Sequence, residues 1–467
     1  MRFKKIGVTL AASALVATAV VVAGGGAAFA SSRTSKASKG GISVLYTNNY
    51  VFDTDALAAA WWKSIANQWK AADPSTKLTL LGTGGTDVDE MNKAAILFRS
   101  ATQTPCVIQL PTTYVGQFAG SGYLASLNSY VNGSSAPAFW TGFPAGVKAM
   151  STIGGKVYAV NAGNNDSGLV YNKVMLEKAG IKMPWDPKNW ADIITAAKAV
   201  HKVDPKVYAL WIGAGVGAGP TNILQGIGNL IYGSTNPEMI TSSGKWVVNS
   251  PGLTAALKFY QTVFKDGLGA PTSELFPSDS VGNPPQLMEK GKLAISLGSN
   301  WYTGDWLPGS GAAWPAAAKD VGIAPIPTEN GQAPDVATTL GGWAFAITNA
   351  CQNKAAAWKF ITLAESPSNQ LSTAIGAGFV PPDTSVGAQS SFVKSSLYQL
   401  QFSQYAADGI SLPNSTNFPV YARALNTVTG DFAQNPDSET VASALSTISS
   451  LVSEQLGSSS VVTIKKK

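Results

Sequence analysis

The side chains with the clearest chemical capacity are aromatic and amide residues that follow predicted strands. Tryptophan and tyrosine rings cover the apolar faces of a sugar, while asparagine, aspartate and threonine bond its hydroxyl groups. Open α/β sheets bind ligands beyond the carboxyl ends of their strands, which is where these residues fall. The set comprises Asn48, Asn49, Tyr50, Asn164, Asn165, Asp166, Trp211, Trp301, Tyr302, Trp306 and Trp343. Although a single tryptophan is more often a core residue, the set favours a site for a sugar-like solute.

The sequence contains no arrangement that requires catalysis. The single histidine, His201, ends a polar helix, and a solvated position explains it better than a catalytic one. The acids Asp87, Asp89 and Glu90 lie by a glycine loop, and nothing fixes the carboxylate spacing that glycoside hydrolysis needs. We therefore expect a protein that is not an enzyme.

A glycine run at residues 213–219 follows a strand and precedes a helix, as a dinucleotide-binding loop does. It departs from that motif in two ways. The third glycine of the motif falls on Ala218, and Pro220 interrupts the helix entry that would hold a pyrophosphate. A loop without a cofactor is the better interpretation, and we expect no cofactor.

Arginine usage narrows the chemistry of the ligand. Beyond residue 41 the chain has only Arg99 and Arg423. Phosphate and carboxylate ligands are best held by forked guanidinium contacts. This scarcity indicates a neutral or a cationic solute.

The formal charge of +6 does not indicate a nucleic-acid partner. Six basic residues lie in the first 41 residues and three are Lys465, Lys466 and Lys467, which leaves 24 basic against 27 acidic residues in the core. Nucleic-acid binding requires clustered Lys and Arg on one face, so we exclude it. Charged residues make up only 13% of the chain, and an acidic medium, in which carboxylates are often protonated, is one hypothesis that explains this.

The first thirty residues have the three parts of a secretory signal. Arg2, Lys4 and Lys5 precede an uncharged apolar run at residues 6–23, and a small-residue box ends at Ala30. We expect cleavage after Ala30 and an extracytoplasmic location, in a periplasm or at the cell exterior. The alternative is an uncleaved anchor, since the apolar run is nearly long enough to span a bilayer.

Cys106 and Cys351 are the two cysteines of the chain. In an oxidising compartment a disulfide is more expected than two free thiols. Two cysteines and one histidine are too few Cys and His ligands for a typical structural zinc site, so we expect no metal.

Strands and helices alternate along the chain, which predicts a parallel sheet in an α/β fold. The 437 residues beyond Ala30 are too many for one ordinary compact domain, so two lobes are expected. The predicted strands span residues 42–46, 77–81, 106–110, 157–160, 168–171, 207–212, 293–297 and 343–348; the predicted helices span residues 55–72, 89–100, 190–201, 221–231, 253–264 and 353–364.

Several sequence segments occur in a specific order and spacing. They lie at residues 69–74, 104–109, 114–127, 155–160, 171–173, 176–181, 189–192, 291–295, 341–343, 357–360 and 378–381. Together they resemble the extracellular solute-binding proteins of ABC importers, in the branch that binds maltose and other oligosaccharides. The resemblance implies a type II periplasmic-binding-protein fold, with a ligand cleft between two α/β lobes and a hinge of crossing strands.

The resemblance also implies how the chain is divided. The expected parts are a signal peptide at 1–30, a linker at 31–41, lobe 1 at 42–163 and 344–395, lobe 2 at 164–343 and 396–458, and a basic C-terminal tail at 459–467. The implied partners are a carbohydrate and the permease subunits of an ABC transporter, and the protein is expected to act as a monomer.

Ligand-binding positions follow from the resemblance residue by residue. The matching positions are Asn48, Asn49 and Tyr50 after the first strand, Thr112 and Thr113 after the third, Asn165 and Asp166 in the crossover, Trp301, Trp343 and Tyr421. Trp211 and Tyr302 join them as aromatic residues beyond strand ends. Because Thr112 and Thr113 stand where the family often has other groups, the sugar itself is not identified.

The family fold places the start of the third strand, at Cys106, beside the end of the strand that precedes Cys351. A disulfide within lobe 1 is thereby implied, which would stiffen that lobe without locking the hinge.

The main alternative to a sugar is a polyamine, which needs carboxylates facing an aromatic cage. Asp53, Asp87, Asp166 and Asp305 keep that alternative open. A secreted carbohydrate-active enzyme is the least supported interpretation.

Overall fold

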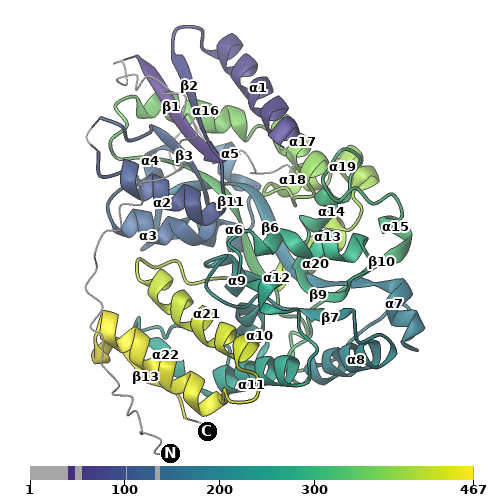
Figure 1. Cartoon of the computed structure of the whole chain (residues 1–467). Coiled ribbons are helices and arrows are strands. Elements are labelled where there is room, and N and C mark those ends of the chain that lie inside the picture. The colour runs from purple at the N-terminus through teal and green to yellow at the C-terminus, as the bar shows by residue number, and fades with distance from the viewer. Residues whose placement is uncertain (1–39, 48–54, 101, 132–136, 466–467) are drawn as a thin grey trace, which may run out of the picture. The chain divides into compact units, whose positions relative to one another are not determined.

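The computed structural model describes residues 40–47, 55–100, 102–131 and 137–465 (Figure 1). The predicted signal peptide, most of the predicted linker, and Asn48, Asn49, Tyr50 and Asp53 lie outside these residues. Within the described ranges, no helix is both long and apolar enough to cross a membrane.

One mixed sheet organises the described residues. Its strands are β1 (Gly41–Thr47), β2 (Lys77–Thr83), β3 (Val107–Pro111), β6 (Ala159–Asn172), β7 (Tyr208–Trp211), β9 (Leu293–Ser299), β10 (Val321–Ala324), β11 (Thr339–Ile347) and β12 (Ile410–Ser411). They pair in the order β2-β1-β3-β11-β6-β9-β7, with β10 beside β6 and β12 beside β11. β1 is parallel to β2 and β3, whereas β11 is antiparallel to β3 and β6.

Lobe 1 is built on β1, β2 and β3 between two layers of helices (Figure 1). Helices α1 (Asp55–Ala72) and α16 (Lys354–Ala364) cover one face of the sheet, and α2 (Asp87–Leu97) and α3 (Val115–Gly120) cover the other. Trp61, Trp62, Ile65 and Trp69 recur at helical spacing along α1 and are buried against the sheet. The predicted helix at residues 55–72 therefore forms because its apolar stripe fits this core.

Lobe 2 is built around β7 and β9. Its core is packed by α8 (Trp190–Val203), α10 (Ile227–Gly233), α11 (Pro251–Lys265), α21 (Phe418–Gln434) and α22 (Val441–Leu456). The hydroxyl of Ser250 caps α11 by accepting from the backbone N–H of Leu253 at 3.0 Å, and Pro251 occupies the first turn.

Shorter elements complete the two lobes. The helices are α4 (Asn128–Val131), α5 (Pro137–Thr141), α6 (Ala145–Met150), α7 (Lys173–Lys178), α9 (Thr221–Leu224), α12 (Thr272–Leu275), α13 (Asn283–Glu289), α14 (Tyr302–Asp305), α15 (Ala317–Asp320), α17 (Pro367–Ala377), α18 (Thr384–Gly387), α19 (Ser390–Ser395) and α20 (Gln399–Tyr405). The strands are β4 (Thr152–Ile153), β5 (Lys156–Val157), β8 (Trp246–Asn249) and β13 (Val461–Thr463). β13 pairs with β8, so part of the predicted C-terminal tail is a strand of lobe 2.

Two long strands, β6 and β11, join the lobes. The first part of β6 pairs with β11, with Val160 opposite Phe345, and its second part pairs with β9 and β10, with Leu169 opposite Leu297. The sequence predicted two strands separated by a polar crossover at residues 164–166. The structure instead has one continuous strand, because Leu340, Gly341 and Gly342 of β11 pair with those residues.

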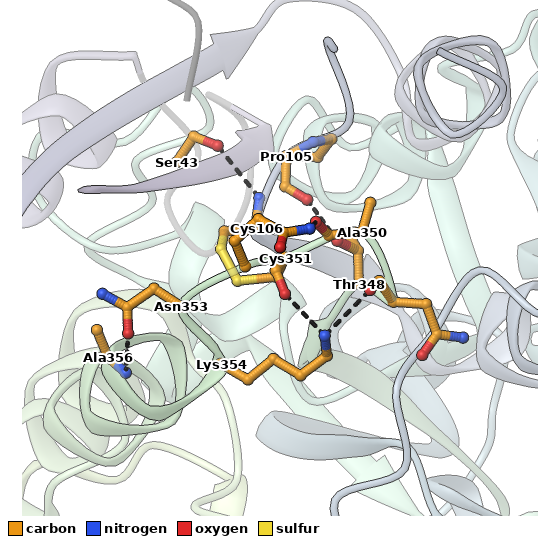
Figure 2. The surroundings of a disulfide bond; sticks show 11 residues. Ser43, Pro105, Cys106, Thr348, Ala350, Cys351, Asn353, Lys354 and Ala356 are labelled. Carbon is orange, nitrogen blue, oxygen red and sulfur yellow. Dashed lines mark hydrogen bonds between the residues drawn. A yellow bond between two sulfur atoms is a disulfide. The ribbon is translucent and has the colours of Figure 1, made fainter. Parts of the chain in front are cut away.

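A buried disulfide joins Cys106, just before β3, to Cys351, just after β11 (Figure 2). The Cα atoms are 4.4 Å apart, and the backbone N–H of Thr348 donates to the carbonyl of Cys106 at 3.0 Å. On the other side, the backbone N–H of Cys106 donates to the carbonyl of Ser43 in β1 at 3.0 Å. The predicted disulfide is thus confirmed, and it belongs to the core of lobe 1.

Candidate functional site

A cleft of about 460 Å³ lies between the cores of the two lobes. Lobe 1 and the crossing strands contribute one wall and lobe 2 contributes the other. The lining residues are Gly85, Thr86, Asp87, Val88, Asn165, Ala218, Thr221, Gln225, Ser278, Asp279, Val281, Gly282, Asn283, Gln286, Trp301, Asp305, Trp343, Ala377 and Phe379. The cavity volume suits a small organic ligand.

Three aromatic side chains line the cleft. Trp301 is partly buried against the core of lobe 2, with its ring edge-to-face on Tyr302 at a centroid distance of 4.6 Å. Trp343 and Phe379 belong to the buried core on the lobe 1 side. The structure therefore brings two of the predicted tryptophans, Trp301 and Trp343, to one cavity.

Asn300 fixes the segment that carries Trp301. Its side-chain amide donates to the carbonyls of Asn164, at 3.1 Å, and Gly378, at 2.8 Å. Its side-chain oxygen accepts from the backbone N–H of Asp166 at 2.6 Å. Since Asn300 is fully buried, these bonds hold the end of β9 against β6 and against the segment that leads to Phe379.

The glycine pair before Trp343 allows the two crossing strands to approach closely. A Cβ on Gly342 would lie 2.1 Å from the carbonyl oxygen of Gly163, and the residue has a φ of +141°. Only glycine, which has no Cβ, fits at this position. Trp343 and Asn165, which come from these adjacent strands, both line the cleft.

Gln225 reaches the cleft because a predicted helix is broken. The sequence predicted one helix over residues 221–231, but the structure has α9 and α10 with a break at Gln225 and Gly226. A Cβ on Gly226 would lie 2.4 Å from the hydroxyl of Tyr260, so the break packs where only glycine fits. Gln225 is 3% exposed and lines the cleft, and its Oε1 accepts from the Tyr302 hydroxyl at 3.4 Å.

Three carboxylates line the cleft, and its described lining contains no Lys, Arg or His. Asp87 lies in the first turn of α2, whose N-terminus is fixed by a capping box between Thr86 and Asp89. Asp305 is in α14, one helical turn after Trp301, and Asp279 precedes α13. Asp87 is only partly buried as a residue, yet desolvation raises the pKa of its carboxyl to about 6.

The predicted residues Thr112 and Thr113 do not line this cleft. They form a single 3₁₀ turn after β3 and border a separate small hollow with Met150, Leu340 and Asn414. Thr112 is buried, and the Thr113 hydroxyl oxygen is buried without a hydrogen-bond partner.

Three of the predicted ligand-binding aromatic residues, together with Trp306, lie in the core of lobe 2 and not in the cleft lining. Trp211 ends β7 and is 2% exposed, and Tyr302 is fully buried. The hydroxyl of Tyr421 donates to the carbonyl of Val247 at 2.7 Å, and its ring stacks on Trp246. Apolar burial accounts for all three positions.

Several lining residues have no clear signal in the sequence. Gln225 and Phe379 are examples, together with the segment that carries Asp279, Asn283 and Gln286. The glycine that follows Gln225 was the one local signal in the sequence that could have indicated a helix break at this residue. Among the described residues, no group of three or more His, Cys, Asp or Glu side chains is placed to hold a metal ion.

Buried acids make the stability of the fold depend on pH. Burial raises the pKa of Asp166, which is 2% exposed, to about 7, and that of Asp87 to about 6. Desolvation also raises the pKa of Glu90 and of Glu365 well above the ordinary value. In each case the native state holds a proton at a pH where the unfolded chain is ionised.

The free energy of unfolding should therefore rise as the pH falls from 8 to 5, with about 2–3 kcal/mol from Asp166 alone. Urea unfolding without ligand across this range measures it. Asp166→Asn removes the titrating group and should flatten the profile by that amount. A stability maximum at pH 8 would contradict the prediction, and it would also exclude adaptation to an acidic medium.

The fold and the cleft define a class of protein. An α/β sheet whose crossing strands connect two lobes, with a polar and aromatic cavity between them, is the architecture of a solute-binding protein.

The chain belongs to the bacterial extracellular solute-binding protein family, whose model matches residues 54–371. The family resemblance and the predicted fold class are thus confirmed. Among curated relatives, a putative binding protein of Brucella abortus is 25% identical over 187 residues, which are 40% of this chain and 42% of that protein. A lactose-binding protein of Rhizobium radiobacter is 24% identical over 64% of this chain and 65% of its own length. The chain thus spans from under half to about two thirds of the length of these relatives.

Solved structures of two other proteins have the same fold. The maltose-bound MalE3 of T. maritima gives a TM-score of 0.72 at 18% identity, covering 89% of this chain and all of that one. An ABC transporter solute-binding protein of Thermotoga lettingae, bound to α-D-tagatose, gives a TM-score of 0.72 at 19% identity. The match again covers 89% of this chain and all of that one. At identities of 18% and 19%, these structures show that the fold is the same and show nothing further about this chain.

Proposed function

We propose that this protein captures a carbohydrate in the cleft between its lobes and delivers it to the permease of an ABC importer outside the cytoplasm. The observation that carries the proposal is the composition of the cleft, which combines Trp301, Trp343 and Phe379 with amides and carboxylates. Aromatic faces stack on sugar rings, and amide and carboxylate groups bond the hydroxyls.

The relatives support the carbohydrate class. One curated relative is a lactose-binding protein, and structures with the same fold contain maltose and tagatose. The predicted positions Asn165, Trp301 and Trp343 line the cleft and are proposed to contact the sugar. The predicted bounds of the two lobes, the monomeric state and the signal peptide remain part of the same proposal.

The lining also supports selectivity against acidic sugars. Uronates and sugar phosphates need cationic or forked donors, and the described lining contains no Lys, Arg or His. Three carboxylates would in addition repel such ligands.

A thermal-shift screen tests the proposal with matched sugars. Uncharged mono- and oligosaccharides should include a ligand that raises the melting temperature by a few degrees when present at ~100 times its Kd. The corresponding uronates and sugar phosphates should give no shift. If no uncharged or amine-bearing sugar shifts the melting temperature, the carbohydrate proposal is wrong, and a shift by an acidic sugar would contradict the proposed selectivity.

A further inference from the structure

Gln225 lies at the break between α9 and α10, where the backbone is fixed on both sides. The carbonyl of the preceding residue, Leu224, accepts from the hydroxyl of Ser167 in β6 at 3.1 Å and from that of Thr339 in β11 at 2.8 Å. The carbonyl of Gln225 accepts from the backbone N–H of Gly213 at 3.0 Å. The side chain of Gln225 therefore starts from backbone that is tied to both crossing strands and to the loop after β7.

Two buried hydroxyls set the direction of the Gln225 amide. Ser296 and Tyr302 are both fully buried, with Ser296 Oγ 3.2 Å from the Tyr302 hydroxyl oxygen. The Tyr302 hydroxyl donates to Gln225 Oε1 at 3.4 Å. Because a tyrosine hydroxyl has a single proton to donate, it accepts from Ser296 in this arrangement. Desolvation raises the pKa of Tyr302 above its ordinary value, so the hydroxyl keeps that proton.

The amide nitrogen of Gln225 remains to bind an occupant of the cleft. Its oxygen is used by Tyr302, and its nitrogen has no acceptor among the described residues. The residue lines the cavity and is only 3% exposed. Polar groups buried to this extent are normally hydrogen-bonded, so the unpaired nitrogen points to a ligand. An amide nitrogen carries two N–H donors and no acceptor, so the ligand atom that it binds must accept.

The surroundings of this amide favour a hydroxyl over other oxygens. Asn165 lies two residues before Ser167 on β6, so its side chain is on the same face of the strand as the hydroxyl that bonds Leu224. Asn165 lines the cleft, and its side-chain oxygen is buried without a hydrogen-bond partner in the described part of the chain. A sugar hydroxyl accepts from the Gln225 amide and still has a proton for a neighbouring acceptor, which an ether or a carbonyl oxygen lacks.

Tyr302 also connects this amide to the aromatic side of the site. Its ring holds the ring of Trp301 edge-to-face at a centroid distance of 4.6 Å, while its hydroxyl bonds Gln225. Trp301 and Gln225 line the cleft, whereas Tyr302 does not. One buried side chain thus orients two side chains that a ligand can contact.

We propose that Gln225 donates a hydrogen bond from its amide nitrogen to a hydroxyl oxygen of the bound carbohydrate, and that Tyr302 and Ser296 are positioning residues that hold the amide in this orientation. This inference rests on the proposed function and adds a specificity-determining residue to it. It also gives Tyr302, which was predicted to contact the ligand directly, a role behind the cleft lining. A sugar that lacks the bound hydroxyl leaves the amide unpaired and is bound more weakly.

Removing sugar hydroxyls one at a time tests the inference on the whole chain. The parent sugar is the tightest binder, by calorimetry, among glucose, galactose, mannose, xylose, maltose, lactose and cellobiose, and it is compared with its monodeoxy analogues. For one analogue the wild type should bind about tenfold or more weakly than the parent sugar. Gln225→Met keeps the side-chain length and removes the amide, so the loss for that same analogue should fall to about threefold or less.

Tyr302→Phe separates the positioning role from the packing role. It keeps the ring beside Trp301 and removes the hydroxyl that orients the amide, so the loss for the same analogue should fall between those of wild type and Gln225→Met. Tyr421→Phe is the matched control, because Tyr421 is also fully buried in lobe 2, bonds a backbone carbonyl and does not line the cleft. This control should keep the loss seen in wild type.

Folding of the variants is checked by melting curves without ligand. Each loss is a ratio of two affinities measured on the same protein, so a uniform decrease in active protein does not alter it. If Gln225→Met does not fold, Gln225→Ala removes the same amide and makes the same comparison.

Three results would overturn the inference, and they separate it from the proposed function. If a parent sugar binds but no analogue has a smaller loss in the Gln225 variant than in wild type, the amide contact is wrong and the carbohydrate function stands. If Tyr302→Phe keeps the same loss as Tyr421→Phe, the positioning role is wrong. If no sugar of the set binds, the carbohydrate function fails together with the inference.

Discussion

Replacing Trp301 with alanine is expected to weaken carbohydrate binding about 30-fold, which corresponds to about 2 kcal/mol. Trp301 lines the cleft, and its ring is held edge-to-face by the buried ring of Tyr302. The adjacent Asn300 ties this segment to β6 and to the segment that leads to Phe379, so the indole is oriented before a ligand arrives. Alanine removes the stacking face without adding a polar group. The measurement is a calorimetric Kd for the sugar that gives the largest thermal shift.

Trp314→Ala is the matched control for this experiment. Trp314 is also a partly buried tryptophan packed on the lobe 2 core, against Trp306, but it does not line the cleft. It should cost similar stability and leave the Kd unchanged, while Trp301→Phe should give an intermediate Kd. Equal affinity in Trp301→Ala and wild type, or an equal loss in both alanine variants, would remove Trp301 from the site.

Periodicity in the sequence predicted the elements well where one face of the element is buried. The helix expected over residues 55–72 coincides with α1 because its tryptophans recur at helical spacing. Strands such as β3 and β9 were found because they are short apolar runs between loops. The order of the family motifs then indicated the two-lobed fold, which periodicity alone does not predict.

Element boundaries were harder to predict where pairing partners are distant in sequence. Residues 164–166 are polar and were predicted as a crossover loop, yet pairing with Leu340, Gly341 and Gly342 makes them strand. The helix break at Gln225 depends on the close contact of Gly226 with Tyr260, which is 34 residues away. Contacts of this kind are tertiary, so a local pattern such as the Gln-Gly pair can suggest a break but does not fix it.

Residue type alone could not show which aromatic residues line the cleft and which belong to the core. Trp211 and Tyr421 were chosen for the same reasons as Trp301 and Trp343, but they face the interior of lobe 2. Both kinds of position follow or flank strands, and both favour large rings. The difference is which way the side chain faces relative to the cleft, and that depends on how the two lobes pack.

The disulfide gives the largest expected effect on stability. Replacing both cysteines with alanine should lower the free energy of unfolding by about 3–5 kcal/mol, because the bond closes a span of 245 residues and so restricts the unfolded chain. It joins the beginning of β3 to the end of β11, where Val107 pairs with Ile347, so both of its ends lie in lobe 1 (Figure 2). Urea unfolding of the oxidised wild type and of the double variant measures the loss.

The same pair of proteins tests whether the disulfide acts on the hinge. Because both cysteines belong to one lobe, the Kd for sugar should change by less than twofold in Cys106→Ala/Cys351→Ala, even though the protein is less stable. Treating the wild type with a reductant should reproduce the loss of stability, and the double variant should not respond to it. If affinity falls along with stability, the bond restrains the relative positions of the lobes, and its role is conformational as well as structural.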